Sequence, residues 1–293
     1  MAEPALFPEG GFRRLRLDIA YDGTLFSGWA TQPGMRTMQD MVEEAIARIV
    51  RHDVDSVVAG RTDAGVHATA QVIHVDLPDP LPDGRDGPPT PDRLAHSLNR
   101  VLADDVSITA ARPVGEGFDA RHSARWRRYR YLVHESAVPD PLLAGLAWTV
   151  AGPLDVRAMH QGIGSMLGSH DFRAFCRKAP GTTSADPIVR LVTDASVRAV
   201  PTTGAVDLAE GRLIRFELQA SSFCHQMVRS IVGQVVDLGL GRSNTADLVE
   251  LLRAGSRAGA AQPAPSHGLC LIGVGYDEKA EHAAGLPVRP LAP

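Results

Sequence analysis

The strongest constraint on the fold of this chain is a set of segments in which apolar and polar residues alternate one by one. Between residues 14 and 21 the apolar positions are Leu15, Leu17, Ile19 and Tyr21, and the same period of two recurs over residues 129–133 and 213–220. A period of two is typical of strands that bury one face. Single helical patterns, rather than a regular strand-helix-strand repeat, separate these strands. We therefore expect two α+β domains with largely antiparallel sheets.

Helical spacing of apolar residues marks five further segments. The first follows Thr37 and the last follows Asn244, and both residue types are favoured N-caps. We expect helices over residues 38–49, 91–102, 154–167 and 223–238, and from the cap Asn244 to near Gly255. Further strands are expected over residues 56–58, 71–76, 190–197 and 269–276. The six prolines from Pro78 to Pro91 predict an exposed irregular loop, because proline lacks the N–H that a helix or sheet needs.

Length and element order set the domain organisation. The chain has 293 residues, enough for about two domains, and its 44% apolar share fits a folded protein. The order strand, helix, strand, strand, helix in the first half recurs in outline in the second. We therefore expect a disordered tail over 1–12, an N-terminal α+β domain over 13–112, a C-terminal α+β domain over 113–280 and a tail over 281–293.

The apolar runs and the cysteines predict the compartment. No run approaches the roughly 18 apolar residues of a membrane span, and the first residues contain glutamate and two prolines but no apolar signal core. We expect a cytoplasmic protein without a membrane partner. Cys176, Cys224 and Cys270 are widely separated and form no Cys-x-x-Cys pair, so we expect free, mostly buried thiols and no metal site.

The charge is unevenly distributed. A net charge of -4 argues, taken alone, against binding to a phosphate backbone. Residues 120–134, however, contain five arginines, two histidines and no acid. The average charge therefore hides a basic segment that is compatible with RNA binding.

The string AGRTDAGVHA, residues 59–68, places Asp63 in a turn between two expected strands. Gly60 and Gly65 allow close backbone approach and positive φ angles, so a substrate could reach the carboxylate. Aspartate and glycine also favour ordinary turns, and a lone Asp-Ala-Gly is more often an ordinary turn than a functional one. The whole string is more informative than these three residues.

AGRTDAGVHA resembles the active-site motif of the tRNA pseudouridine synthases of the TruA family, in which the aspartate is catalytic. The resemblance continues in family order from about residue 13 to residue 277. The further segments are Tyr21-Asp22-Gly23-Thr24 followed by Phe26, Gly28 and Trp29; Phe118-Asp119-Ala120-Arg121; Arg127-Arg128-Tyr129-Arg130-Tyr131; His170-Asp171-Phe172; Met227 to Gly233; and Gly268-Leu269. The chain differs from the pattern at Ala30, where the family has glutamine, and at Thr183-Ser184-Ala185, where the family has a basic segment.

The resemblance implies two RRM-like halves with largely antiparallel sheets that meet at a central cleft, the pseudouridine synthase fold. It implies a tRNA pseudouridine synthase, an isomerase that acts as a homodimer and converts uridines at positions 38–40 of the tRNA anticodon stem-loop. Such an isomerisation consumes no redox equivalent and no phosphoryl donor, which agrees with the lack of GxGxxG and Walker A strings in the sequence. We therefore expect no cofactor, nucleotide or metal.

The resemblance also implies the roles of individual residues. Asp63 is the catalytic nucleophile, Arg229 is its cationic partner, and Tyr129 stacks on the target uracil and assists proton transfer. Arg61 completes the expected catalytic set: from its place in the turn beside Asp63, we expect it to meet an RNA phosphate or to help extrude the nucleotide. The implied tRNA-binding set is Tyr129, Phe118, Asp119, Ala120, Arg121 and His122.

Physical chemistry is consistent with a cation beside Asp63. Burial under a nucleobase raises the pKa of a carboxylic acid, and a nearby guanidinium offsets that rise. Arg229 lies in a strongly apolar predicted helix, where an unpaired charge is costly, although a side chain at the helix rim can also reach solvent. Asp63 could attack the ribose, deprotonate it or attack the base, and all three routes remain open at this point.

Two other functions compete with this one. A non-catalytic tRNA-binding or chaperone paralogue would keep the cleft but lack turnover, and the intact Arg61, Asp63, Tyr129 and Arg229 argue against it. A retaining glycosidase would need a second carboxylate about 5 Å from the first, and the turn offers no obvious one.

Overall fold

The computed structural model describes residues 11–177, 186–200 and 211–277. These residues form two compact units. Unit 1 contains the described parts of Met1–Ala64, Ala68–Arg125 and Val274–Pro293, and unit 2 those of Gly65–His67 and Trp126–Gly273. The expected tail over 281–293, most of that over 1–12 and the segment 183–185 lie outside the described residues. The domain boundary between residues 112 and 113 stays a prediction.

The sheet of unit 1 has the strand order β4-β1-β3. β1 (Phe12–Tyr21) pairs in antiparallel fashion with both β3 (His67–Pro78) and β4 (Val106–Pro113), and β2 (Ser56–Val58) pairs with β3. The predicted burial of the apolar positions of β1 is confirmed, because Leu15, Leu17 and Ile19 are fully buried, but Arg16 between them is also buried.

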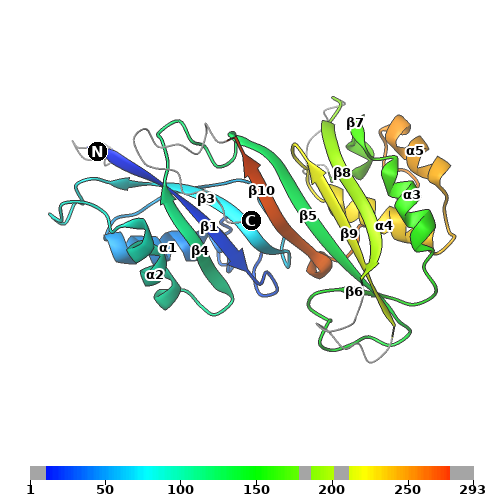
Figure 1. Ribbon diagram of the computed structural model, residues 1–293, viewed down its shortest axis with the longest axis horizontal. Coiled ribbons are helices and arrows are strands. Elements are labelled where there is room, and N and C mark those ends of the chain that lie inside the picture. The colour runs from blue at the N-terminus through cyan, green and yellow to red at the C-terminus, as the bar shows by residue number, and fades with distance from the viewer. Residues whose placement is uncertain (1–10, 178–185, 201–210, 278–293) are drawn as a thin grey trace. The chain divides into compact units, whose positions relative to one another are not determined.

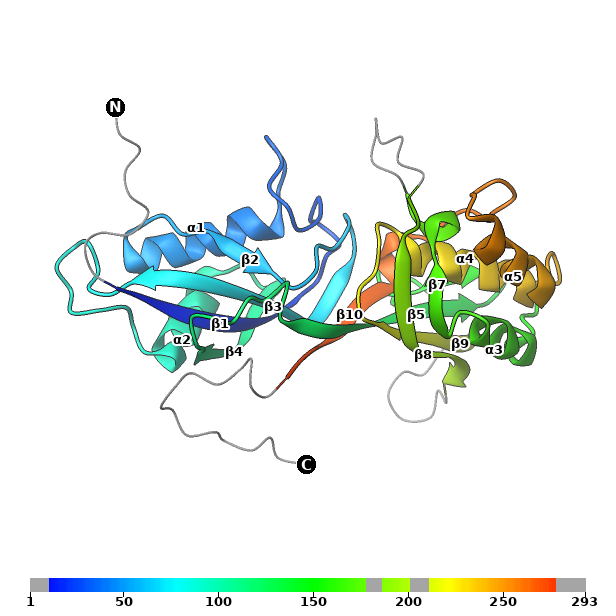
Figure 2. The ribbon, with the colours of Figure 1, turned by 90° about the horizontal axis from the view of Figure 1, so that it is seen from above.

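Two helices complete the core of unit 1. In Figure 2, α1 (Met38–Val50) lies along one side of β1 and β3. α2 (Pro91–Val101) packs against β4 and α1. The buried residues of the two helices are Met38, Val42, Ala45, Ile46, Val50, Leu94 and Leu98. The predicted cap of α1 is confirmed, since Asp40 N donates to Thr37 Oγ1 at 3.4 Å.

The proline-rich segment after β3 is irregular, as predicted, but it is anchored to unit 1. Leu81 is buried, and Arg85 donates from Nη2 to Ile49 O at 3.1 Å and to Val50 O at 3.2 Å. These carbonyls belong to the last residues of α1, where a helix has no intrahelical donors left. The segment therefore caps the C-terminal end of α1 through the Arg85 side chain.

The sheet of unit 2 has the strand order β5-β9-β8-β7, with β6 beside β5. Its strands are β5 (Ala124–Glu135), β6 (Trp148–Val150), β7 (Gly168–Asp171), β8 (Val189–Val200) and β9 (Arg212–Ala220). All of these pairings are antiparallel except that of β5 with β6. β10 (Leu269–Tyr276) contributes its first five residues to unit 2 and its last three to unit 1. The predicted α+β class with largely antiparallel sheets is confirmed (Figure 1), and the meeting of the two halves at a cleft stays a prediction.

Three helices cover one face of the unit 2 sheet. α3 (Val156–Gly164) packs against β8 and α4 (Met227–Gly239), and Figure 2 shows α4 and α5 (Thr245–Ala254) on the same side of β8 and β9. The predicted cap Asn244 is confirmed as part of a capping box with Asp247. The predicted start of α4 at Phe223 is wrong: the helix begins at Met227, because Gln226 has a φ of 62° and cannot be helical.

Candidate active site

Asp63 and Arg61 lie on the turn that joins β2 to β3. Asp63 is half-buried and Arg61 is exposed, whereas Thr62 between them is buried. Gly65 has a φ of +76°, which residues with a side chain rarely adopt, so the predicted use of positive φ is confirmed there. Gly60 does not adopt a positive φ. The turn therefore leaves Asp63 half-exposed in unit 1, whereas its neighbour Thr62 is buried.

Gly28 and Trp29 contact the backbone of this turn. Gly28 has a φ of +99°, and a Cβ atom there would lie 3.0 Å from Thr62 O and 3.2 Å from Ala64 N. Trp29 N donates to Thr62 O at 3.0 Å. The residues next to Asp63 in the sequence do not predict these contacts. The sequence feature that indicates them is the Gly28-Trp29 pair, which is distant from Asp63 in the chain.

The segment Phe118–His122, from the implied tRNA-binding set, also belongs to unit 1. Phe118 and Ala120 are buried, whereas Arg121 and His122 are exposed. Asp119 Oδ1 accepts from Arg121 N at 2.8 Å and from His122 N at 2.7 Å. Partial burial raises the pKa of Asp119, but these donors outweigh it and hold that pKa below its ordinary value. The side chains of Arg121 and His122 are thus the part of the segment that an RNA can reach.

The buried side chain of His74 is hydrogen-bonded to the backbone of this segment. His74 Nδ1 accepts from Ala120 N at 3.0 Å, so Nδ1 must be unprotonated. Burial first, and then the charge of Arg14, lower the pKa of His74 below 6.5. The unfolded chain takes up a proton on this residue at a higher pH than the folded chain does. The contribution of His74 to stability is therefore fully present above pH 6.5 and is lost as the pH decreases towards its folded pKa.

We expect His74→Asn to flatten the dependence of the Tm on pH between about 7 and 5. The Oδ1 atom of asparagine can accept the Ala120 N–H from the position of Nδ1 but does not titrate. Thermal melts at several pH values measure the effect, and the exposed His96→Asn serves as the control. A wild-type slope in His74→Asn would show that other groups dominate this pH range.

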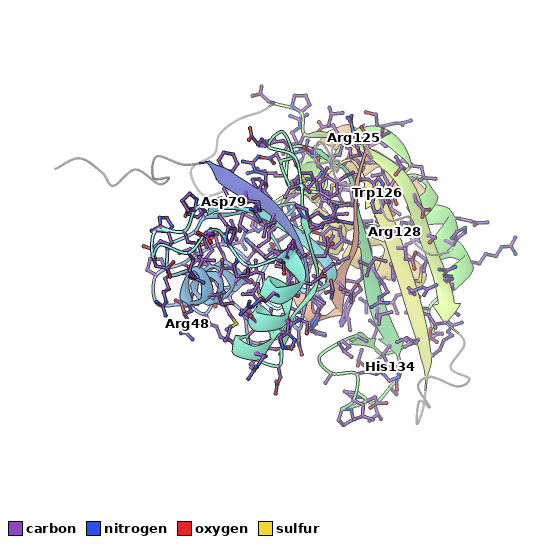
Figure 3. All side chains as sticks on the ribbon, turned by 60° about the vertical axis from the view of Figure 1, so that its left-hand side comes forward. Arg48, Asp79, Arg125, Trp126, Arg128 and His134 are labelled. Carbon is purple, nitrogen blue, oxygen red and sulfur yellow. A yellow bond between two sulfur atoms is a disulfide. The ribbon has the colours of Figure 1, made fainter. Side chains whose placement is uncertain are left out.

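The arginines of residues 120–134 do not form a uniform basic patch. Arg125 and Arg128, both labelled in Figure 3, are paired within the chain. Arg125 Nε donates to Asp277 Oδ2 at 2.7 Å, and Arg128 Nη2 donates to Asp194 at 3.1 Å and to Glu217 at 2.5 Å. Partial burial raises the pKa of Glu217, but Arg128 first and then other arginines keep it below its ordinary value. Two of the five arginines counted in the sequence are therefore balanced by acids that are distant in the chain.

Tyr129 lies on β5 in unit 2, opposite Leu218 of β9. Its side chain is buried and meets the ring of Phe223 edge to face, with 5.2 Å between the ring centroids. An aromatic partner fixes the ring plane, as a stacking platform requires.

Arg229 lies in the first turn of α4 and is half-buried. Its Nε donates to Ala264 O at 2.7 Å, and its own carbonyl accepts from Ala264 N at 2.9 Å. Tyr131 donates to the next carbonyl, Pro265 O, at 2.8 Å. Burial raises the pKa of Tyr131 and outweighs the opposing charge of Arg229, so the tyrosine stays neutral.

The predicted site residues are divided between the two units. The structure places Arg61, Asp63 and residues 118–122 in unit 1, and Tyr129 and Arg229 in unit 2.

His67, inside the AGRTDAGVHA string, also has a defined position. It is buried, and its Nε2 lies 2.9 Å from Gly145 O and 3.0 Å from His267 O. Because carbonyl oxygens only accept, Nε2 carries the proton. Sequence reasoning missed this role, since both acceptors are distant in the chain.

The expectation of three free thiols is wrong for two of them. Cys176 and Cys224 form a disulfide with a Cα–Cα distance of 5.7 Å, whereas Cys270 is free and buried. The two cysteines are separated by 48 positions, and no sequence motif links them. Folding brings together the residue after the short helix η1 (Arg173–Phe175) and the segment before α4.

The described part of the chain comprises residues 11–177, 186–200 and 211–277. None of the helices there is long and apolar enough to cross a membrane. No cluster of three or more His, Cys, Asp or Glu side chains there could hold a metal ion.

The chain is similar to known proteins over most of its length. A family model described as "tRNA pseudouridine synthase" matches residues 19–123 and 163–277. A protein named tRNA pseudouridine synthase A from Frankia casuarinae is 42% identical to the chain over 278 residues, which cover 94% of the chain and 93% of the relative. A protein of the same name from Leifsonia xyli subsp. xyli is 43% identical over 281 residues, which cover 92% of the chain and 93% of the relative. A protein of the same name from Gloeobacter violaceus is 38% identical over 271 residues, 92% of the chain and 82% of the relative.

Proposed function

The chain belongs to the tRNA pseudouridine synthase family and is an isomerase that converts uridine to pseudouridine in tRNA, and we propose that it does so at positions 38–40 of the anticodon arm with Asp63 as the catalytic carboxylate. One observation carries this assignment. Asp63 is half-exposed on its turn, whereas the preceding residue, Thr62, is buried and its carbonyl accepts a hydrogen bond from Trp29 N. A fixed carboxylate with access from outside is what attack on an extruded nucleotide requires.

The reaction breaks the C1'–N1 bond of the uridine and forms a C1'–C5 bond, while the C5 proton leaves and N1 gains a proton. Asp63 would stabilise or trap the separated sugar or base by attack on the ribose, deprotonation of the ribose or attack on the base. Tyr129, oriented by Phe223, supports the uracil ring and assists the proton transfer. In this proposal Arg229 is the cationic partner of the Asp63 carboxylate, and Arg61 contacts a phosphate or helps the nucleotide leave the stack.

Tritium at C5 gives a direct assay of this reaction. Purified protein and a tRNA labelled with [5-³H]uridine should release tritium into water, because C5 loses its proton when the new bond forms. A transcript with cytidine at positions 38–40 should release none. Release from both transcripts would refute the proposed positions, and binding without release from either would favour the non-catalytic paralogue.

We propose that Arg121 and His122 contact the tRNA backbone, since they are the exposed members of the 118–122 segment. We expect Arg121→Ala to weaken tRNA binding and to reduce the slope of log K against log salt by about one. Filter binding at several salt concentrations measures this slope. The exposed Arg93→Ala on α2, in the same unit, serves as the control. Unchanged affinity together with a loss of turnover at saturating tRNA would contradict this role.

We also propose that the protein is a homodimer in the cytoplasm and needs no cofactor. Family resemblance supports the dimer, and the chemistry supports the last point because isomerisation consumes no co-reactant. Light scattering after size exclusion tests the oligomeric state directly.

A further inference from the structure

The turn that carries Asp63 is attached to three buried polar side chains of unit 1. Tyr21 ends β1, Thr62 precedes Asp63, and Gln71 lies within β3. Their exposed fractions are 5%, 7% and 0%, respectively. The Tyr21 hydroxyl lies within hydrogen-bonding distance of both other side chains.

The contacts define a chain of hydrogen bonds. The Tyr21 and Thr62 hydroxyl oxygens are 2.7 Å apart. Gln71 Nε2 donates to Gly60 O at 2.8 Å and, more weakly, to the Tyr21 hydroxyl at 3.4 Å. Because Gly60 O can only accept, the amide nitrogen of Gln71 must face it. Either hydroxyl can be the donor in the bond between Tyr21 and Thr62.

This chain holds the turn at two points in addition to the Trp29 bond. Gln71 fixes the carbonyl of Gly60, and Tyr21 fixes the side chain of Thr62, whose carbonyl already accepts from Trp29 N. The backbone on the N-terminal side of Asp63 is therefore restrained through both its main chain and a side chain. Little freedom remains for the direction in which the carboxylate leaves the turn.

Stability alone does not explain why these groups are polar. Burying hydroxyl and amide groups costs free energy unless every partner is in place, and apolar side chains of similar volume often serve a core equally well. A fully bonded polar network does, however, fix one geometry. Misplacement of a reacting group by about 1 Å can cost roughly 100-fold in rate.

We propose that Tyr21, Thr62 and Gln71 are positioning residues that aim the Asp63 carboxylate, acting through the turn rather than on the tRNA. The inference rests on the proposed role of Asp63. It predicts that loss of either hydroxyl slows the chemical step without loosening the complex with tRNA.

The test uses variants that remove one hydroxyl and keep the volume. Thr62→Val and Tyr21→Phe should each lower the single-turnover rate at saturating tRNA roughly 10- to 100-fold, with the Kd for tRNA within about threefold of wild type. Thr62→Ser keeps the hydroxyl and should restore most of the rate. Because both deletions break the same link, the double variant should be little slower than the slower single variant.

A stability control separates positioning from general weakening. Asn244→Ala removes the cap of α5, so it should lower the Tm while leaving the rate unchanged. Wild-type single-turnover rates in Thr62→Val and Tyr21→Phe would overturn the proposal, as would a failure of Thr62→Ser to recover the rate lost in Thr62→Val. If one variant does not fold, the other still decides.

Asp63→Asn distinguishes the two levels of inference. If it retains turnover, the proposed function of Asp63 fails, whatever the hydroxyl variants do. If it is inactive while both hydroxyl variants react at the wild-type rate, only the positioning proposal fails.

Discussion

Asp63→Asn should abolish pseudouridine formation while leaving tRNA affinity within a few-fold of wild type. The carboxamide has nearly the shape of the carboxylate, so the turn held by Gly28, Trp29 and Thr62 should fold as before. It is neither a nucleophile nor a base at neutral pH, and all three routes open to Asp63 need one or the other. We expect the single-turnover rate to fall about 10⁴-fold or more, the scale on which loss of a nucleophile acts.

The matched control is Asp92→Asn, which removes an exposed carboxylate from the first turn of α2 in the same unit. It should leave both rate and affinity unchanged, apart from a small loss of helix stability. Tritium release and filter binding, carried out on the same preparations, separate chemistry from binding. Turnover by Asp63→Asn within tenfold of wild type would exclude Asp63 as the nucleophile or base.

The strands and helices that bury one continuous face could be predicted from the sequence. In β1, β5 and β9 buried apolar side chains recur at every second position over most of the strand, because one side of each sheet meets the helices. The alternation is not strict, because Arg16, His134, Leu213 and Glu217 are buried between them. β4, β6 and β7 lack this signal. β4 buries only Val106 and Ile108, and β6 and β7 have three and four residues. Their strand conformation is set by pairing with neighbours, which a local pattern does not contain.

Element boundaries depended on tertiary contacts in the same way. The helical spacing continues back to Phe223, but Cys224 is bonded to Cys176 and Gln226 adopts a positive φ, so α4 starts later. β3 starts earlier than residue 71, at His67, although its first residues do not alternate clearly. In both cases a distant partner decides the conformation.

The candidate site, too, was only partly predictable from local sequence. The turn around Asp63 was predictable because glycines and an aspartate between two strands act locally. The supports of the turn were not, since Gly28, Tyr21 and Gln71 come from other elements. The basic segment was misleading as a count, because the acids that balance Arg125 and Arg128 lie far along the chain.

Gly233→Ala should destabilise unit 2 severely, because α4 passes directly over another stretch of backbone at this position. A Cβ atom on Gly233 would lie 2.1 Å from Gln262 O and 3.3 Å from Ala264 N, and a backbone carbonyl cannot swing aside as a flexible side chain can. Either the helix or the 262–264 segment must move. Overpacking of this kind costs about 1–3 kcal/mol or more, and thermal or urea melts should show it as a clear loss of stability.

The displacement should also reach the candidate site, because the same segment binds Arg229. Ala264 accepts from Arg229 Nε and donates to Arg229 O, so moving it removes the contacts that orient the guanidinium. We therefore expect the fraction of Gly233→Ala that still folds to have a lower single-turnover rate. Gly164→Ala is the matched control: Gly164 is also helical, as the last residue of α3, and a Cβ there would meet no atom from outside its own helix within 4 Å. Alanine there should be neutral or slightly stabilising. Equal stability of the two variants would show that the close approach of α4 to residues 262–264 does not limit the fold.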